Sequence, residues 1–171
     1  MSLPPESLVQ QFAERFPRAV DTAPASDAGT GGSAAPMQPP PTCQVVDFKR
    51  RGVHVEAAVT AELVVVVARW LDENGYALDT VTGVDWLVSN EMEVVYDFFH
   101  PAAFWRVAVR VRLPRAAPGL PTISPVFPGA NWHERETHEF FGIVFQGHPD
   151  LSPLLLPEDA DYHPLRKDYR P

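Results

Sequence analysis

The sequence contains a single cysteine, Cys43, among 171 residues. One thiol excludes an internal disulfide framework and any zinc or iron–sulfur site built from several cysteines of this chain. Long apolar runs are also missing, since the longest, residues 63–68, stops far short of the roughly 18 residues that span a bilayer. The first residues lack the basic and apolar regions of a secretion signal, so we expect an intracellular protein.

An excess of basic charge is absent as well. The chain has 14 Lys and Arg against 22 Asp and Glu, a formal net charge of -8. Nucleic-acid binding is not expected, because neutralising phosphates requires basic patches. Hydrophobic residues make up 45% and charged residues 21%, which is typical of a folded globular chain long enough for one domain.

Prolines divide the chain into three parts. Eight of the 19 lie at or before Pro41, one lies between Cys43 and Leu113, and ten lie from Pro114 onward. Proline is poorly tolerated inside helices and central strands. The regular core is therefore predicted at residues 43–145, with its most regular part at about residues 44–113 and a rigid, extended connection over residues 114–128.

The N-terminal part predicts a helix and a linker. Leu8, Phe12 and Phe16 recur at helical spacing, so we expect an amphipathic helix within residues 1–20. Residues 21–42 have no aromatic side chain and are rich in Pro, Gly and Ala. This composition predicts a linker, flexible at first and stiffer near its end.

Two segments of the core alternate clearly between apolar and polar residues. In residues 92–99 the even positions are apolar, whereas Glu93 and Asp97 fall on the other face; in residues 104–113 the odd positions are apolar, opposite a row of arginines. Such alternation predicts antiparallel strands with one buried face. We interpret the arginines as cross-strand partners of Glu93 and Asp97 rather than as an anion site.

The other elements follow from shorter signals. Thr60 and Asn131 are predicted to cap helices, and Gly75 and Gly142 to end them. The predicted strands are residues 44–48, 53–56 and 81–88, with a basic turn at 49–52, and the predicted helices are residues 60–74 and 132–141. The fold class is therefore α+β, a two-layer α/β domain with a mixed, largely antiparallel sheet.

Residues 146–171 predict an extended, Pro-rich C-terminal arm. Prolines recur too often for a helix or strand, yet the arm carries several leucines and tyrosines, among them Leu151, Leu165 and Tyr169. A structureless stretch of this length is unusual in a compact domain, and its apolar content disfavours disorder. Two interpretations remain open, an arm that buries these side chains on another subunit and an arm wrapped over its own domain.

The sequence gives little support for a catalytic or metal-binding site. His133 and His138 are five residues apart, which rotates them about 140° from each other on a helix, whereas a zinc-protease helix places its histidines four apart. A free-standing metallo-enzyme using His133, His138 and His148 is therefore only a low-ranked alternative. No nucleophile has an identifiable base and no phosphate-binding loop is present, so no catalytic, cofactor-binding or metal residues are predicted.

Three C-terminal segments resemble a known family. They are NWHERETHEFFGI at residues 131–143, GHPDL at 147–151 and PLRKDY at 164–169. In this order and spacing they are similar to the 30-kDa subunit of respiratory complex I, the proton-pumping NADH–quinone oxidoreductase. Residues 81–85 and 94–96 are also similar to that family. Glu139 departs from it, because the family has Asp there, and Ser152 and Pro153 replace residues that are often basic.

The resemblance implies a non-catalytic subunit of the peripheral arm. It implies packing on the large quinone-site subunit and near the subunit with the terminal iron–sulfur cluster, with no cofactor in this chain and with FMN and the clusters on other subunits. It also implies peripheral association, through partners, with the cytoplasmic face of the bacterial inner membrane. Membrane-bound nickel–iron hydrogenases and F420H2 dehydrogenases carry a homologous subunit and remain the alternative.

The resemblance also implies partner-binding residues. Glu134, Arg135 and Glu136 are expected to form structural and interface ion pairs, and the two later motifs are expected to anchor the arm. The full predicted set is Glu134, Arg135, Glu136, His148, Pro149, Asp150, Leu151, Leu165, Arg166, Lys167 and Asp168.

Overall fold

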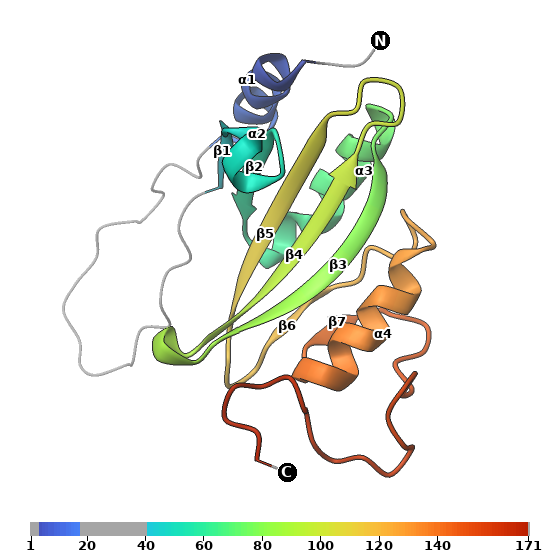
Figure 1. The fold of residues 1–171 in the computed structure, drawn as a ribbon. Helices are drawn as coiled ribbons and strands as arrows, with labels where there is room; N and C mark the ends of the chain where they lie inside the picture. Colours follow the sequence, from blue (N-terminus) through green and yellow to red (C-terminus); the bar gives the residue numbers. More distant parts are fainter. Residues whose placement is uncertain (1–3, 18–40, 171) are drawn as a thin grey trace, which may run out of the picture.

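A five-stranded sheet forms the centre of the computed structural model, which describes residues 4–17 and 41–170 (Figure 1). Its strands lie in the order β1-β2-β5-β4-β3, and only β2 and β5 are parallel neighbours. The strands are β1 Thr42–Val45, β2 Val55–Val59, β3 Ala77–Trp86, β4 Glu91–Phe99 and β5 Arg106–Pro114. The mixed, largely antiparallel sheet is as predicted, and most of the predicted linker, residues 21–40, lies outside the described residues.

Helices pack on one face of this sheet and beside its β3 edge (Figure 1). A short parallel pair, β6 and β7, lies next to α4. The helices are α1 Pro5–Arg15, α2 Phe48–Arg51, α3 Val64–Glu73 and α4 Ala130–Phe141, with 3-10 turns η1 Ala61–Leu63 and η2 Leu87–Ser89; the pair is β6 Gly119–Pro121 and β7 Val144–Gln146.

The buried face follows the predicted alternation. Met92, Val94 and Tyr96 of β4 are fully buried, and Val109 and Val111 of β5 lie beside them. At the other end of the core, the ring of Trp70 meets Phe12 and Phe16 edge-on, with centroids 6.0 and 5.9 Å apart. These aromatic pairs attach α1 to α3, so the amphipathic stripe of α1 is part of the core.

Three local predictions need correction. The predicted 44–48 strand ends at Val45, because the Asp47 carboxylate accepts the Lys49 amide at 3.0 Å and starts the single turn α2. Asn131 lies inside α4 and does not cap it, since the residue before the helix is Gly129. The rigid, extended connection predicted at residues 114–128 contains a short strand, β6, which pairs with β7 and carries Pro121 at its end, where proline is tolerated. Gly142 does end α4, in the left-handed region at φ 73°.

Candidate partner interface

The C-terminal arm runs back along α4 and is bonded to it. The Leu165 amide donates to the Phe140 carbonyl at 3.2 Å, and Arg166 Nε donates to the Phe141 carbonyl at 2.7 Å. His163 Nδ1 lies 2.8 Å from the Glu139 carbonyl oxygen. These contacts satisfy carbonyl groups at the C-terminal end of the helix, which have no partner within it. The arm is therefore attached to its own domain (Figure 1).

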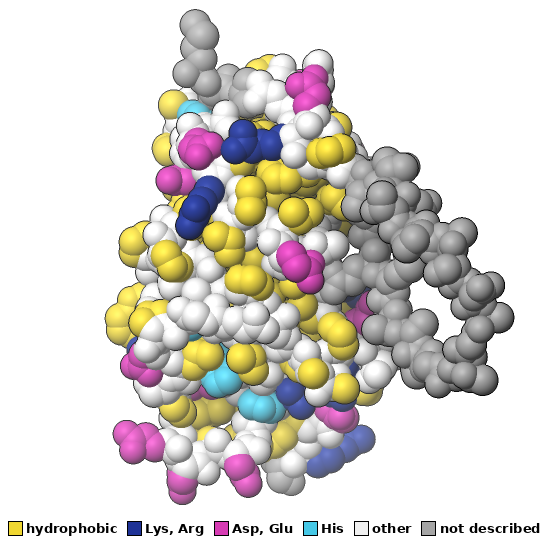
Figure 2. Space-filling model, turned by 180° about the vertical axis from the view of Figure 1, so that it is seen from behind, with side chains coloured by type: hydrophobic (Ala, Val, Ile, Leu, Met, Phe, Trp, Pro, Cys, Tyr) yellow, Lys and Arg dark blue, Asp and Glu magenta, His cyan; other side chains and the backbone are white. Residues whose placement is uncertain are grey.

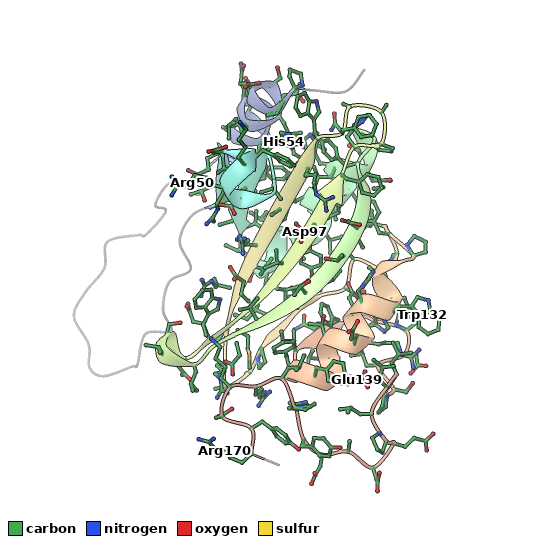
Figure 3. The ribbon with its side chains drawn as sticks, in the orientation of Figure 1. Arg50, His54, Asp97, Trp132, Glu139 and Arg170 are labelled. Atoms are coloured by element: carbon green, nitrogen blue, oxygen red, sulfur yellow. The ribbon has the colours of Figure 1, made fainter. Side chains whose placement is uncertain are left out.

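Glu139 is the principal polar anchor of the arm. Its carboxylate accepts the backbone amides of Leu154, Leu155 and Leu156 at 2.9 to 3.2 Å, and the residue is buried (labelled in Figure 3). Hydrogen bonds to an ionised acceptor are stronger than neutral ones. One side chain of α4 thus fixes the turn that carries the leucines.

Arg135 attaches the arm one turn before Glu139. Its guanidinium donates to the Ser152 carbonyl at 3.0 Å and the Pro153 carbonyl at 3.1 Å, and it lies 5.3 Å from the ring centre of Trp132. These two acceptors are main-chain carbonyls, and a third is the Ser152 hydroxyl at 3.2 Å. The contact therefore does not need the basic residues that the family often has at these two positions.

A second anchor binds the end of the arm to the sheet. The Asp85 carboxylate, buried at the end of β3, accepts two hydrogen bonds from Arg115 at 2.8 and 3.0 Å and the Lys167 amide at 2.8 Å. Asp168 also pairs with Arg115, at 2.5 Å. The hydrogen bonds from Arg115 are the main cause that lowers the pKa of Asp85. This cluster holds residues 166–168 in place.

Apolar side chains on α4 and the arm remain exposed although the backbone is anchored. Leu155 is 66% exposed, Trp132 58% and Leu165 53%, and Tyr162 is also exposed. We call these four residues the α4–arm surface. Exposed apolar patches mark interaction sites on monomeric proteins. Polar groups thus bind the arm to its own domain, while these four apolar side chains stay exposed.

The family described as respiratory-chain NADH dehydrogenase, 30 Kd subunit, matches residues 57–171, which include α4 and the whole arm. The chain belongs to this family.

The similar proteins are named as C subunits of two different complexes. The C subunit of NADH-quinone oxidoreductase from Roseiflexus castenholzii is 43% identical over 115 residues, covering 64% of this chain and 66% of the relative. The C subunit of F(420)H(2) dehydrogenase from Methanosarcina mazei is 44% identical over 96 residues, covering 54% and 59%. The chain thus matches less than two thirds of the length of either relative.

Solved structures share the fold. A chain of the membrane-bound sulfane sulfur reductase, an archaeal respiratory membrane complex, superposes with a TM-score of 0.72 at 24% identity, covering 96% of this chain and 85% of that one. A trypsin-resistant fragment of Nqo5 superposes with a TM-score of 0.52 at 30% identity, covering 57% and 82%. Among the described residues, no helix of this 30-kDa-family chain is both long and apolar enough to cross a membrane.

The predicted partner residues of this family member divide into three groups. Glu134 must be removed from the set, because it is fully buried and bonds within the chain, to a hydroxyl and an amide. Arg135, His148 and Arg166 serve largely to attach the arm, and Leu151 packs against the core. The residues that remain exposed are Glu136, Pro149, Asp150, Leu165, Lys167 and Asp168.

The three histidines of the metallo-enzyme alternative, His133, His138 and His148, do not gather at one place. His133 lines a groove beside β3, His138 Nδ1 lies 2.8 Å from the Ile143 carbonyl oxygen, and His148 is buried against α4. In residues 4–17 and 41–170 no group of three or more His, Cys, Asp and Glu could hold a metal ion. The geometry therefore does not provide the cluster that the metallo-enzyme alternative requires.

Ion pairs cover the outer face of the sheet. Glu93 pairs with Arg112 at 3.1 Å and with Arg110 at 3.6 Å, which confirms the predicted cross-strand pairing for this carboxylate. Asp97 is different (labelled in Figure 3), since Arg106 instead pairs with Asp79 and burial raises the pKa of Asp97. The opposite side of the molecule, seen in Figure 2, carries scattered charged groups of both signs among apolar ones, and no basic patch dominates its described part.

Sequence reasoning missed three of the anchoring residues, Glu139, Asp85 and Arg115. Asp85 lies in the VTGVD segment that resembles the family, but its partners are 30 and 82 residues away. The burial of Glu139 could have been predicted from the sequence, because this residue stands beside the apolar residues at the end of α4.

Proposed function

We propose that this chain is a non-catalytic peripheral-arm subunit of a complex I-type NADH–quinone oxidoreductase, and that its α4–arm surface binds neighbouring subunits. The observation that carries this proposal is the construction of the arm. Buried carboxylates hold its backbone, while Leu155 and Leu165 keep their apolar surface exposed. Such a prearranged surface suits assembly, because little conformational entropy is lost when a partner binds.

We infer the partners from the resemblance to the family. We assign the α4–arm surface to the large quinone-site subunit and to the subunit that carries the terminal iron–sulfur cluster. The chain would then associate with the cytoplasmic face of the bacterial inner membrane through these partners. FMN and the iron–sulfur clusters would be held by other subunits, and this chain would support the module that passes electrons to quinone.

One observation favours a second candidate. The Methanosarcina mazei relative is named as part of an F(420)H(2) dehydrogenase and is as similar in identity as the relative from Roseiflexus castenholzii. The same docking role fits either complex, because the electron donor would bind elsewhere. The proteins that co-purify with the chain distinguish the two candidates.

Affinity purification of the tagged full chain from detergent-solubilised membranes tests the proposal. Mass spectrometry should recover the quinone-site and cluster-bearing subunits together with either NADH-oxidising or F420H2-oxidising subunits. The Leu155→Glu and Leu165→Glu variants should lose these partners, because each places a charge in the apolar contact. Val88→Glu is the matched control, since Val88 is fully exposed at η2 and is not part of the α4–arm surface.

Two outcomes would contradict the proposal. A chain that purifies alone from these membranes is not such a subunit. A Leu155→Glu chain that folds normally by circular dichroism and still recovers every partner would show that the α4–arm surface is not the docking site.

A further inference from the structure

Glu134 is a completely buried carboxyl group that the docking role does not use. It lies on the inner side of α4, with a relative exposure of 0%. Its Oε1 accepts the Ile123 amide at 2.9 Å, and its Oε2 is hydrogen-bonded to the Thr122 hydroxyl. Both contacts come from the segment that follows β6, so this carboxyl group joins α4 to that segment.

No cation among the described residues compensates a negative charge at Glu134. The one basic group close enough to pair with it is His148, whose Nε2 lies 3.8 Å from Oε2. The His148 ring is committed to the main chain, since Nδ1 accepts the Asp150 amide at 3.1 Å and Nε2 lies 3.2 Å from the Asn131 carbonyl oxygen. An acceptor at Nδ1 and a donor at Nε2 define the neutral tautomer.

The other described groups that face this site carry no positive charge either. Tyr96 comes from β4, and its buried hydroxyl has no partner among the described residues. Thr122 and Ser124 contribute hydroxyls from the segment after β6, and the neighbouring Arg135 of α4 turns away to the arm. Burying an ionised carboxyl without a cation is costly. Burial accordingly raises the pKa of Glu134 to about 7.

Hydroxyl groups connect the buried carboxyl to the surface. Thr122 Oγ1 lies 2.9 Å from Ser124 Oγ, and Ser124 is half-buried in a surface groove of about 580 Å³ that also contains Trp132 and Pro149. The same heavy-atom positions fit both charge states. A carboxylate accepts the Thr122 hydroxyl proton, whereas a carboxylic acid donates to Thr122 Oγ1, whose own proton then turns to Ser124.

We propose that Glu134 is a proton-binding site that exchanges its proton with the surface through Thr122 and Ser124, and that loss of this proton weakens the attachment of α4 to the segments around Ile123 and His148. The site takes up or releases one proton near neutral pH. This inference concerns the isolated chain and does not rest on the proposed partners.

Carbon-13 NMR of the carboxyl groups in the full chain tests the binding site directly. One resonance should titrate near neutral pH in the wild type and in Glu136→Gln, and should be absent in Glu134→Gln. Glu136 is the matched control because it lies on the same helix and is exposed. A wild type in which every glutamate titrates near its ordinary pKa would overturn the proposal, and this outcome needs no variant to fold.

Stability measurements test the consequence of proton loss. The folded chain keeps a proton that the unfolded chain releases, so stability falls as pH rises from about 4.5 to about 7. Across this window the unfolding constant should rise about tenfold per pH unit more steeply in wild type than in Glu134→Gln. Glutamine reproduces the protonated acid, donating to Thr122 while accepting from Ile123. Identical pH profiles for the two chains would refute the coupling.

The hydroxyl path has its own test. Thr122→Val keeps the volume of the side chain and removes its hydroxyl, and it should slow proton exchange at Glu134 in the NMR titration by about tenfold or more, a barrier increase of about 1.4 kcal/mol. The matched control is Thr82→Val, which makes the same change at an exposed threonine of β3. Unchanged exchange in Thr122→Val would show that the proton leaves by another path.

Discussion

Replacing Glu139 should release the arm while leaving the sheet intact. Its carboxylate accepts three consecutive backbone amides, of Leu154, Leu155 and Leu156. A hydrogen bond to a charged group contributes about 1.5–3 kcal/mol net. When the arm opens, water replaces part of the hydrogen bonding that these three amides lose. Glu139→Ala should therefore lower the free energy of local opening by about 3 kcal/mol, which raises the opening constant about a hundredfold.

Hydrogen exchange followed by mass spectrometry measures this effect. Peptides from residues 150–165 should exchange about a hundredfold faster in Glu139→Ala, whereas peptides from β4 should not change. Glu139→Gln should have a smaller effect because one amide oxygen remains as an acceptor. Glu136→Ala is the control on the exposed side of α4. Unchanged protection of the arm in Glu139→Ala would refute the assignment of Glu139 as its anchor, and faster exchange throughout the sheet would show that the residue supports the whole fold instead.

Three further changes test other parts of the structure. Asp85→Asn should destabilise the chain by about 2–4 kcal/mol in urea unfolding, because Arg115 and the Lys167 amide lose a buried, charged acceptor. The pKa of Asp85 is lowered in the folded chain, so this stabilisation is present above about pH 4 and lost in acid, and the difference between the two chains should shrink as pH falls. Gly83→Ala should cost about 1–3 kcal/mol and lower Tm, because its new Cβ would lie 2.5 Å from the Phe141 ring. Phe12→Ala should cost about 3–5 kcal/mol by calorimetry if α1 belongs to the core, and under about 1 kcal/mol if it does not.

Periodicity predicts the parts of this fold whose causes are local. The strands β4 and β5 could be read from alternation, since one face of each had to be apolar to cover the core. Gly142 could be assigned to the end of α4, because few other residues adopt a positive φ without strain. The short pair of β6 and β7 could not be predicted in this way, because each strand has only three residues and its partner is 25 residues away along the chain.

The residues that anchor the arm show that the role of a buried carboxylate cannot be predicted from the sequence alone. A carboxylate among apolar residues, such as Glu139 or Glu134, has the same sequence signature whether it binds a partner, a proton or its own main chain. Only the three-dimensional placement separates these roles, and here it assigns Glu139 to the main chain and buries Glu134 beyond the reach of any partner. The error in placing Glu134 on the interface follows from treating three adjacent charges as one surface, although residues on a helix one apart point in different directions.

The chemistry of the arm is compatible with both its attachment to its own domain and the proposed binding of a partner. Arg135, Glu139 and Asp85 hold the arm mainly through its main-chain groups, and this attachment leaves the side chains of Leu155 and Leu165 exposed. If the arm were held by its leucines, these side chains would have to leave the domain before they could bind a partner. The free energy gained in the partner contact would then be offset by the loss of the intramolecular contact. Because Leu155 and Leu165 stay exposed on a fixed backbone, the proposed apolar contact with a partner would add to the intramolecular bonds rather than compete with them.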